Sequence, residues 1–357
     1  MENRFNELME QSSELPHGDV KIEILEEAIR IADTLQDEER GFYARMELTD
    51  TANFAGRFEK VIPSFSWCLA QLDKAPEYYH EFYLLWQYKW VLYNLSEFPQ
   101  IQQDQIEDTF NDFKNRCQQY GYSLRPYYQM KIKYAKLHEN HNLAHSCFEA
   151  WLEQPRDDLS DCYACELTAQ AEHLLHIGQV HAALAIAEPI FKQEVSCAEV
   201  PHITYGPFLI PLLENDSPEL ANEFHQSGMR LIGQKQGFLS TIAHHMKYLT
   251  VVDPNAAIHY MEAFLSEALI SHTLDTKFQF FLACSILLKH LDPETIATMQ
   301  LPDHITSAWI DEEVKRLAQQ FDQRNQTHTY AKEIAHTTHQ INALKQKYGN
   351  ATTPHLS

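Results

Sequence analysis

Three cysteines and one histidine in the middle of the chain have the residue types and the spacing of a metal site. Cys162 and Cys165 are separated by two residues, and Cys197 and His202 complete the pattern C-x2-C-x31-C-x4-H. A gap of two residues lets both sulfurs reach one ion, and thiolate and imidazole are ligands that tetrahedral zinc favours. The spacing therefore predicts a zinc ion held by these four residues.

Other interpretations of the same cysteines stay open. The CYAC pair could be a redox couple, but a thioredoxin-like couple requires a strand before its helix, and the sequence predicts none. The thiols could also be unconnected and buried. The fourth ligand is open as well, because four nearby carboxylates could replace the histidine: Asp157, Asp158, Asp161 and Glu199. Four protein ligands would close the coordination shell, so the predicted zinc is structural.

The elements that must position these ligands are predicted to be helices. Apolar residues recur at spacings of three and four, only 10 glycines occur in 357 residues, and valine-rich alternating runs are almost absent. Turn-forming segments interrupt this pattern at regular intervals. The SerAspCys sequence before the CYAC pair predicts a helix start capped by Ser160 or Asp161. We expect an all-α chain of paired helices in series, with the metal ligands at one end of a helical hairpin.

A repeat underlies the helix pairs. In LLHIGQVHAALAIAEPI, residues 174–190, Leu174, Gly178, Ala183 and Ala187 fall at the offsets of a tetratricopeptide unit. Small or apolar anchors equivalent to Ala183 recur 33 to 45 residues apart, whereas a strict tetratricopeptide repeat has a period of about 34. The anchors are Ala28, Val61, Ile106, Ala144, Ala183, Ala221 and Ala256. The pattern predicts a divergent tetratricopeptide-like α-solenoid.

The last part of the chain keeps a four-three apolar spacing that predicts a helical hairpin. Its apolar positions are Ile310, Val314, Leu317 and Phe321, followed by Tyr330, Ile334, Ile341 and Leu344. The expected organisation is a repeat array over residues 1–290, a hairpin that caps it over residues 291–350, and a disordered tail over residues 351–357. A terminal repeat needs such a cap to cover its apolar face.

Four segments carry a closer resemblance. FSWCLAQLDKAP, LLWQYKWV, PRDDLSDCYAC and CAEVPH resemble segments of a little-characterised family of bacterial tetratricopeptide-repeat proteins, over most of the chain. The resemblance implies a helical repeat fold and a role in protein interaction, and it implies no reaction. The four predicted zinc ligands depend on spacing and chemistry alone.

Composition restricts the partners. With 50 acidic against 28 basic side chains, the net charge of −22 would repel the phosphates of nucleic acids and anionic membranes. No stretch approaches the roughly 18 apolar residues of a membrane span, and the seven cysteines are scattered and odd in number. We expect a soluble cytoplasmic protein in a reducing compartment.

An aromatic run around residues 79–98 predicts a buried helix rather than a ligand cage, because its rings cover most of the helix circumference. From this run Lys89, Tyr88 and Gln87 are predicted to emerge into a groove. Counting back from the anchors gives further groove candidates on the first helix of each pair: Asp50, Asn53, Gln129, Lys133, Lys136, His245 and Tyr248. Paired lysines would suit a carboxylate-bearing peptide, although the asparagine pattern of known clamps is missing.

The function predicted from these features is a scaffold or adaptor that binds a protein or peptide partner. No nucleophile elbow, phosphate-binding loop, H-E-x-x-H or kinase signature occurs, so the chain is not expected to be an enzyme. A metal-dependent hydrolase or redox protein that uses the cysteine-rich site is the alternative, and a peptide-responsive regulator is a variant of the scaffold. The sequence leaves the oligomeric state open.

Overall fold

The computed structural model describes residues 1–233, 235 and 237–349, and these residues form 18 helices and no strand. The predicted all-α class is confirmed. None of the described helices is both long and apolar enough to cross a membrane. The predicted tail, residues 351–357, lies outside the described residues.

The chain divides into two compact units. The first contains residues 1–136 and 140–160, and the second contains residues 137–139 and the described residues from 161 onward. The division falls inside the predicted array, directly before the cysteine pair, and the C-terminal hairpin belongs to the second unit.

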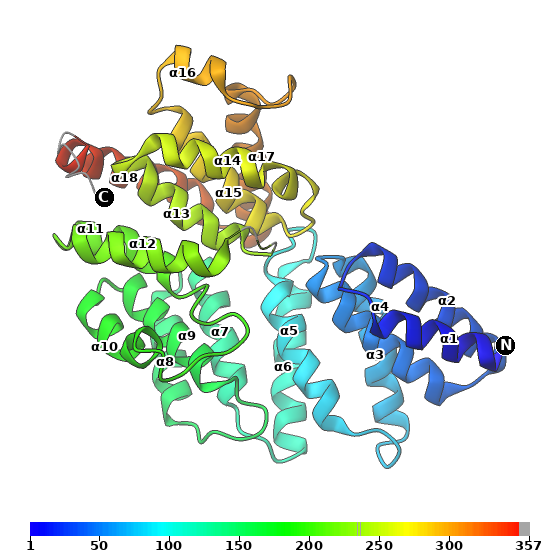
Figure 1. The fold of residues 1–357 in the computed structure, drawn as a ribbon. Helices are drawn as coiled ribbons and strands as arrows, with labels where there is room; N and C mark the ends of the chain where they lie inside the picture. Colours follow the sequence, from blue (N-terminus) through cyan, green and yellow to red (C-terminus); the bar gives the residue numbers. More distant parts are fainter. Residues whose placement is uncertain (234, 236, 350–357) are drawn as a thin grey trace. The chain divides into compact units, whose positions relative to one another are not determined.

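The first unit is built from consecutive helices that pack in neighbouring pairs (Figure 1). Its helices are α1 (Glu2–Ser13), α2 (Asp19–Leu35), α3 (Glu38–Phe54), α4 (Phe58–Lys74), α5 (Glu81–Leu95), α6 (Gln103–Gln119), α7 (Arg125–Leu137) and α8 (His141–Glu153). Asp37 starts α3 by accepting a hydrogen bond from the backbone of Arg40. Helix α3 also packs against α5, so the first helices of successive pairs lie side by side.

Helix α5 differs from the buried helix that the aromatic run predicts. Its core positions are taken by aliphatic residues such as Leu84 and Leu92, while Tyr83 and Tyr93 are exposed. Lys89 is fully buried instead of emerging into a groove: its ammonium donates to the carbonyl of Leu159 at 2.7 Å. The prediction is wrong for Lys89, because a long side chain can reach a carbonyl of the loop after α8 across the core. It is also wrong for Tyr88, which is buried.

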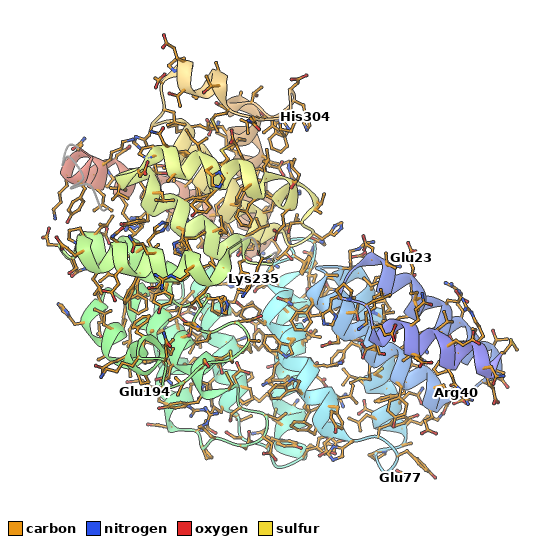
Figure 2. The ribbon with its side chains drawn as sticks, viewed as in Figure 1. Glu23, Arg40, Glu77, Glu194, Lys235 and His304 are labelled. Atoms are coloured by element: carbon orange, nitrogen blue, oxygen red, sulfur yellow. The ribbon has the colours of Figure 1, made fainter. Side chains whose placement is uncertain are left out.

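The second unit repeats the pairwise packing. Its helices are α9 (Tyr163–His176), α10 (Val180–Phe191), α11 (Tyr205–Glu214), α12 (Pro218–Ile232), α13 (Leu239–Val252), α14 (Pro254–Ile270), α15 (Leu274–Leu288), α16 (Pro293–Thr298), α17 (Ser307–Asn325) and α18 (Thr329–Tyr348). Helices α9, α11, α13, α15 and α17 each pack against the next member of this series. The intervening α10, α12 and α14 pack beside them, and side chains fill the spaces between the helices (Figure 2).

The repeat anchors lie at the helix contacts. Six of the seven anchors are buried, and Ala256 in α14 is the exception. In that helix the buried positions are Ala257, Met261 and Phe264, one residue later than predicted. Asp253 accepts from the amide of Ala256 and so caps the start of α14. The predicted spacing therefore identifies the helix, while the position of its apolar face is shifted by one residue.

Helices α17 and α18 are the last two helices of the described residues, and they pack against each other. Helix α17 packs on α15, and α18 packs on α13 and α15. The rings of Phe321 and Tyr330 stack with their centroids 4.5 Å apart. Of the predicted seam residues, Tyr330 is buried and Ile334 is partly buried. The other six are buried: Ile310, Val314, Leu317, Phe321, Ile341 and Leu344. The hairpin thus covers an apolar face of the second unit.

A pair of histidines links α12 and α13 inside the second unit. Nδ1 of His225 and Nδ1 of His245 are 2.9 Å apart, so one ring donates to the other. Burial lowers the pKa of His225 to about 4, against the opposing effect of Asp253, and burial also lowers the pKa of His245 well below its usual value. Both rings are therefore neutral in the folded protein near pH 7.

We expect acid to destabilise the second unit through this pair. Between about pH 6.5 and pH 4 an unfolded histidine binds a proton that folded His225 does not. The free energy of unfolding therefore decreases as the pH is lowered through this range, by on the order of 3 kcal/mol for this residue. His225→Gln keeps a hydrogen-bonding side chain without the titration and should reduce this dependence in denaturant melts. His259→Gln, at an exposed position of α14, is the matched control. Equal acid sensitivity in wild type and His225→Gln would contradict the prediction.

Candidate metal centre

The three predicted cysteine ligands converge in the second unit. The sulfurs of Cys162, Cys165 and Cys197 all lie within 4.8 Å of one another, and the sulfurs of Cys165 and Cys197 are 3.4 Å apart. Ligand sulfurs about 2.3 Å from a tetrahedral zinc ion would be about 3.8 Å apart. The three thiols are therefore placed closely enough to hold one metal ion.

Local structure explains how two ligands come from one helix start. Cys162 is the N-cap of α9, and its sulfur accepts a hydrogen bond from the amide of Cys165 at 3.2 Å. The predicted cap by Ser160 or Asp161 is wrong, because the helix begins one residue later and Ser160 instead accepts from the amide of Asp157. Capping by Cys162 places its sulfur beside the first turn, where Cys165 lies.

The third ligand sits in a turn after α10. Cys197 donates its amide to the carbonyl of Val200 at 3.0 Å, and its sulfur accepts from the amide of Val200 at 3.4 Å. Backbone N–H groups that point at sulfur favour its charged form, which is the form that binds metal. Two of the three sulfurs thus receive a backbone hydrogen bond that stabilises thiolate.

The thiols differ in environment. Burial raises the pKa of Cys165, and the neighbouring sulfurs of Cys162 and Cys197 raise it further. Burial opposes ionisation of Cys197 too, but backbone N–H groups of Glu199 and Val200 bring the pKa of that thiol below its ordinary value. The acidic thiol of Cys197 thus lies beside the more buried thiol of Cys165. A bound cation would offset the energetic cost of burying charged sulfur in this pair.

Apolar residues surround the inner side of the cluster. Ala164, Leu167, Ile190 and Val200 form a small buried core that Cys165 and Cys197 contact. Cys162 is exposed. The cluster is therefore shielded on the side of α9 and α10 and reachable from the side of Cys162.

His202 does not join the three sulfurs. Its Nε2 atom is 3.1 Å from the ammonium of Lys235, which Figure 2 labels in the loop after α12, and its ring stacks on Phe238 with centroids 5.5 Å apart. Burial and Lys235 both lower the pKa of His202. A ring that accepts from Lys235 through Nε2 carries its proton on Nδ1 and has no lone pair there for a metal. In this arrangement the predicted fourth ligand is engaged elsewhere.

The carboxylates considered as substitutes do not join the cluster either. Among the described residues, no aspartate, glutamate or histidine completes the group formed by the three cysteines. Asp157 is used within the first unit, where its carboxylate accepts from the amides of Ser123 and Leu159. Among the described atoms, the three sulfurs are therefore the group that could hold a metal ion.

The groove residues predicted on α3 and α7 lie in the first unit. Asp50 is half-buried with its carboxylate 3.9 Å from Nε2 of His17, and burial raises its pKa. Asn53 is buried, and its side-chain oxygen accepts from the side-chain amide of Asn94 at 2.9 Å. On α7, Gln129, Lys133 and Lys136 are all half-buried.

Lys133 is engaged inside the protein. Its ammonium is 2.5 Å from a carboxylate oxygen of Glu97 and lies 3.7 Å from the ring centroid of Tyr93. A lysine held by a carboxylate and a ring is poorly suited to clamp a second carboxylate. The expectation of a carboxylate-bearing peptide at this lysine therefore loses its main support.

The two groove residues predicted in the second unit are not accessible. His245 has an exposed fraction of 0% and Tyr248 one of 3%, so both belong to the core. Their prediction as groove residues is wrong because α13 is covered by α11, α14, α15 and α18. A helix with so many neighbours has no free face at these positions.

Sequence reasoning missed an aromatic surface in the first unit. Phe54 lies beside the predicted Asn53, and its ring stacks with His17 at 5.0 Å and approaches Trp90 at 6.1 Å. Trp90 in turn contacts Tyr93 at 6.4 Å. The signal that could have found Phe54 is its place on the same helix as Asp50, whereas Trp90 and Tyr93 belong to the aromatic run on α5, which was interpreted as core.

The family resemblance of the sequence analysis rests on its four quoted segments, and it stays a prediction. Comparison of the chain with protein-family models, with curated proteins and with solved structures finds no match.

Proposed function

We propose that this protein is a tetratricopeptide-like helical scaffold that binds a protein or peptide partner and is stabilised by zinc at Cys162, Cys165 and Cys197. The observation that carries the scaffold is the packing of α9, α11, α13, α15 and α17 in one series, with paired helices beside them. Helix pairs stacked in this way bury their apolar faces on neighbours and leave an extended surface for a partner. Anchors 33 to 45 residues apart support the same proposal.

Zinc is the metal that this site would favour. Thiolate ligands select zinc over magnesium or calcium. Two of the sulfurs lie at the start of α9 and the third lies in the turn after α10. A metal there would tie the start of α9 to the turn after α10. The proposed role is therefore structural, as for a clamp on one repeat.

The fourth ligand distinguishes two functions. If the His202 ring turns away from Lys235, an imidazole nitrogen becomes available and the shell closes, which suits a scaffold. If His202 stays on Lys235, the fourth position is open to water, which suits the alternative of a metal-dependent enzyme. The contact between His202 and Lys235 is the observation that favours the enzyme alternative.

Cobalt substitution and X-ray absorption test these alternatives. A closed site should show three sulfurs and one nitrogen, and His202→Ala should change the cobalt spectrum while Lys235→Ala should not weaken it. If the metal of the wild type carries an exchangeable water and His202→Ala leaves the spectrum unchanged, the result would favour the enzyme and contradict a purely structural site.

Partner capture tests the scaffold itself. Native protein isolated from its own cells and cross-linked before mass spectrometry should yield recurrent partner peptides joined to α3, α5 or α7. The cross-linked positions matter, since a scaffold uses a defined surface whereas adventitious binding does not. Isolation of the protein alone, together with turnover of small substrates, would contradict the proposal.

A further inference from the structure

An aromatic strip crosses the first unit on α3 and α5. The strip consists of Phe54, Trp90 and Tyr93. The ring centroids of Phe54 and Trp90 are 6.1 Å apart, and those of Trp90 and Tyr93 are 6.4 Å apart. His17 extends one end by stacking on Phe54, and Lys133 of α7 lies over Tyr93 at the other end. Rings from two helices thus lie in one row, with the His17 ring at one end and the Lys133 ammonium at the other.

The strip is exposed although its rings are large. Phe54 keeps 51% of its surface exposed and Tyr93 keeps 42%, and Trp90 is half-buried. The first unit has a core of its own that does not include these three rings. Contiguous exposed rings of this kind are characteristic of interaction sites rather than of surface that contacts only solvent.

Charge around the strip favours a basic occupant. The Asp50 side chain retains 35% exposure beside the Phe54 end, and the ammonium of Lys133 at the Tyr93 end is already balanced by Glu97. The whole chain carries a net charge of −22. The position of Lys133 over Tyr93 also demonstrates that a ring face of the strip accepts an ammonium group.

We propose that the aromatic strip, with Asp50, binds a lysine- or arginine-containing segment of a partner protein. The aliphatic stems of such side chains pack on rings while their charged ends remain near ring faces and carboxylate. A segment of this kind combines the two properties the strip offers, apolar contact area and negative potential. The inference rests on the proposed scaffold function and names the chemistry of its partner.

Fluorescence anisotropy with two short dye-labelled peptides tests the proposal. In one peptide lysine and arginine alternate with serine, and in the other glutamate replaces the basic residues. We expect wild type to bind the basic peptide, and Phe54→Ala or Asp50→Asn to weaken that binding about three- to tenfold, the range of a cation–π contact or a partly exposed charge pair. Both positions are partly exposed, so the thermal melts of the variants should match wild type.

Matched controls separate the strip from general attraction to an acidic protein. Tyr78→Ala removes a ring that is 80% exposed and lies outside the strip, and Asp108→Asn removes one charge from the exposed face of α6. Both controls should bind the basic peptide as wild type does. If Asp108→Asn weakens binding as much as Asp50→Asn, the attraction is unspecific and the proposal is overturned.

Three other results would overturn it. They are tighter binding of the glutamate peptide, no binding of the basic peptide by wild type, and self-association that disappears in Phe54→Ala, which would assign the strip to a second copy of the chain. The test also stands apart from that of the scaffold: cross-linked partners that are retained by both Phe54→Ala and Asp50→Asn would leave the scaffold intact and reject the strip.

Discussion

Cys165→Ser is expected to reduce bound zinc from about one equivalent per chain to a small fraction of that. Serine is a poor zinc ligand, and the change leaves two sulfurs where the structure places three. Cys165 also packs in the core between α9 and the turn after α10, so metal loss should loosen that contact. Elemental analysis of protein purified under reducing conditions measures the metal directly.

Stability should fall together with the metal. A ligand present at a hundred to a thousand times its dissociation constant stabilises by roughly 3 to 4 kcal/mol, and 1 kcal/mol corresponds to about 2 to 4 °C for a domain of this size. The melting transition of the second unit should therefore drop by roughly 6 to 16 °C, while the helices of the first unit remain folded. Cys147→Ser, a buried cysteine of the first unit outside the cluster, is the control and should keep its zinc.

Metal-free wild-type protein with the same melting temperature as the zinc-loaded form would refute the site. Reducing conditions are essential, because the sulfurs of Cys165 and Cys197 are 3.4 Å apart and could form a disulfide on oxidation. A disulfide would remove two ligands and imitate metal loss. The thiol count of each sample therefore accompanies the metal measurement.

Removal of residues 304–357 is expected to make the protein aggregate or lose its last repeats. The truncation removes α17 and α18, which cover Phe278, Phe281 and Leu282 of α15. Each large apolar side chain returned to water costs roughly 1.5 to 3 kcal/mol. Bound zinc should persist in the soluble fraction, because the cysteine cluster lies on other helices of the unit.

Polar contacts add to the effect of this truncation. The hydroxyl of Tyr330 donates to Asp275 at 2.7 Å, and buried Lys247 is linked through Gln279 to Glu333. Without α18, Asp275 and Gln279 on α15 lose these partners, whereas Lys247 keeps its bond to Gln279. The loss of a buried partner costs about 1 to 3 kcal/mol for each group.

Point variants in α18 give a milder test of the same cap. Ile341→Ala empties a fully buried position and should cost about 2 to 4 kcal/mol. His339→Ala, on the exposed side of the same helix, should cost less than about 0.5 kcal/mol. Sedimentation of wild type and truncation decides the competing role as a dimerisation arm: a dimer that becomes a well-folded monomer would overturn the cap.

The sequence predicted the helices and most buried anchors because these depend on local periodicity. A helix must bury one stripe, so residues such as Ala183 and Ile310 are recognisable from the spacing of their apolar neighbours. The same spacing located α14 but placed its buried stripe one residue early, at Ala256 instead of Ala257. Periodicity defines a helix more firmly than it defines the angle at which that helix meets its neighbours.

Exposure was the property that periodicity could not decide. Trp90 and Tyr93 have the spacing of core residues, yet they form an exposed strip, whereas His245 and Tyr248 were predicted to line a groove and are buried. Each outcome depends on how many other helices cover the position. That number follows from packing between segments distant in sequence.

The metal site shows the same division. By itself the sequence determined that Cys162 and Cys165 share a helix start and that Cys197 follows the next helix, because a hairpin returns its end to its beginning. Only the tertiary structure decided that the three sulfurs meet and that His202 lies against Lys235 and Phe238 instead. Spacing fixes which backbones are near one another, but the direction of a side chain depends on the neighbours that compete for its contacts.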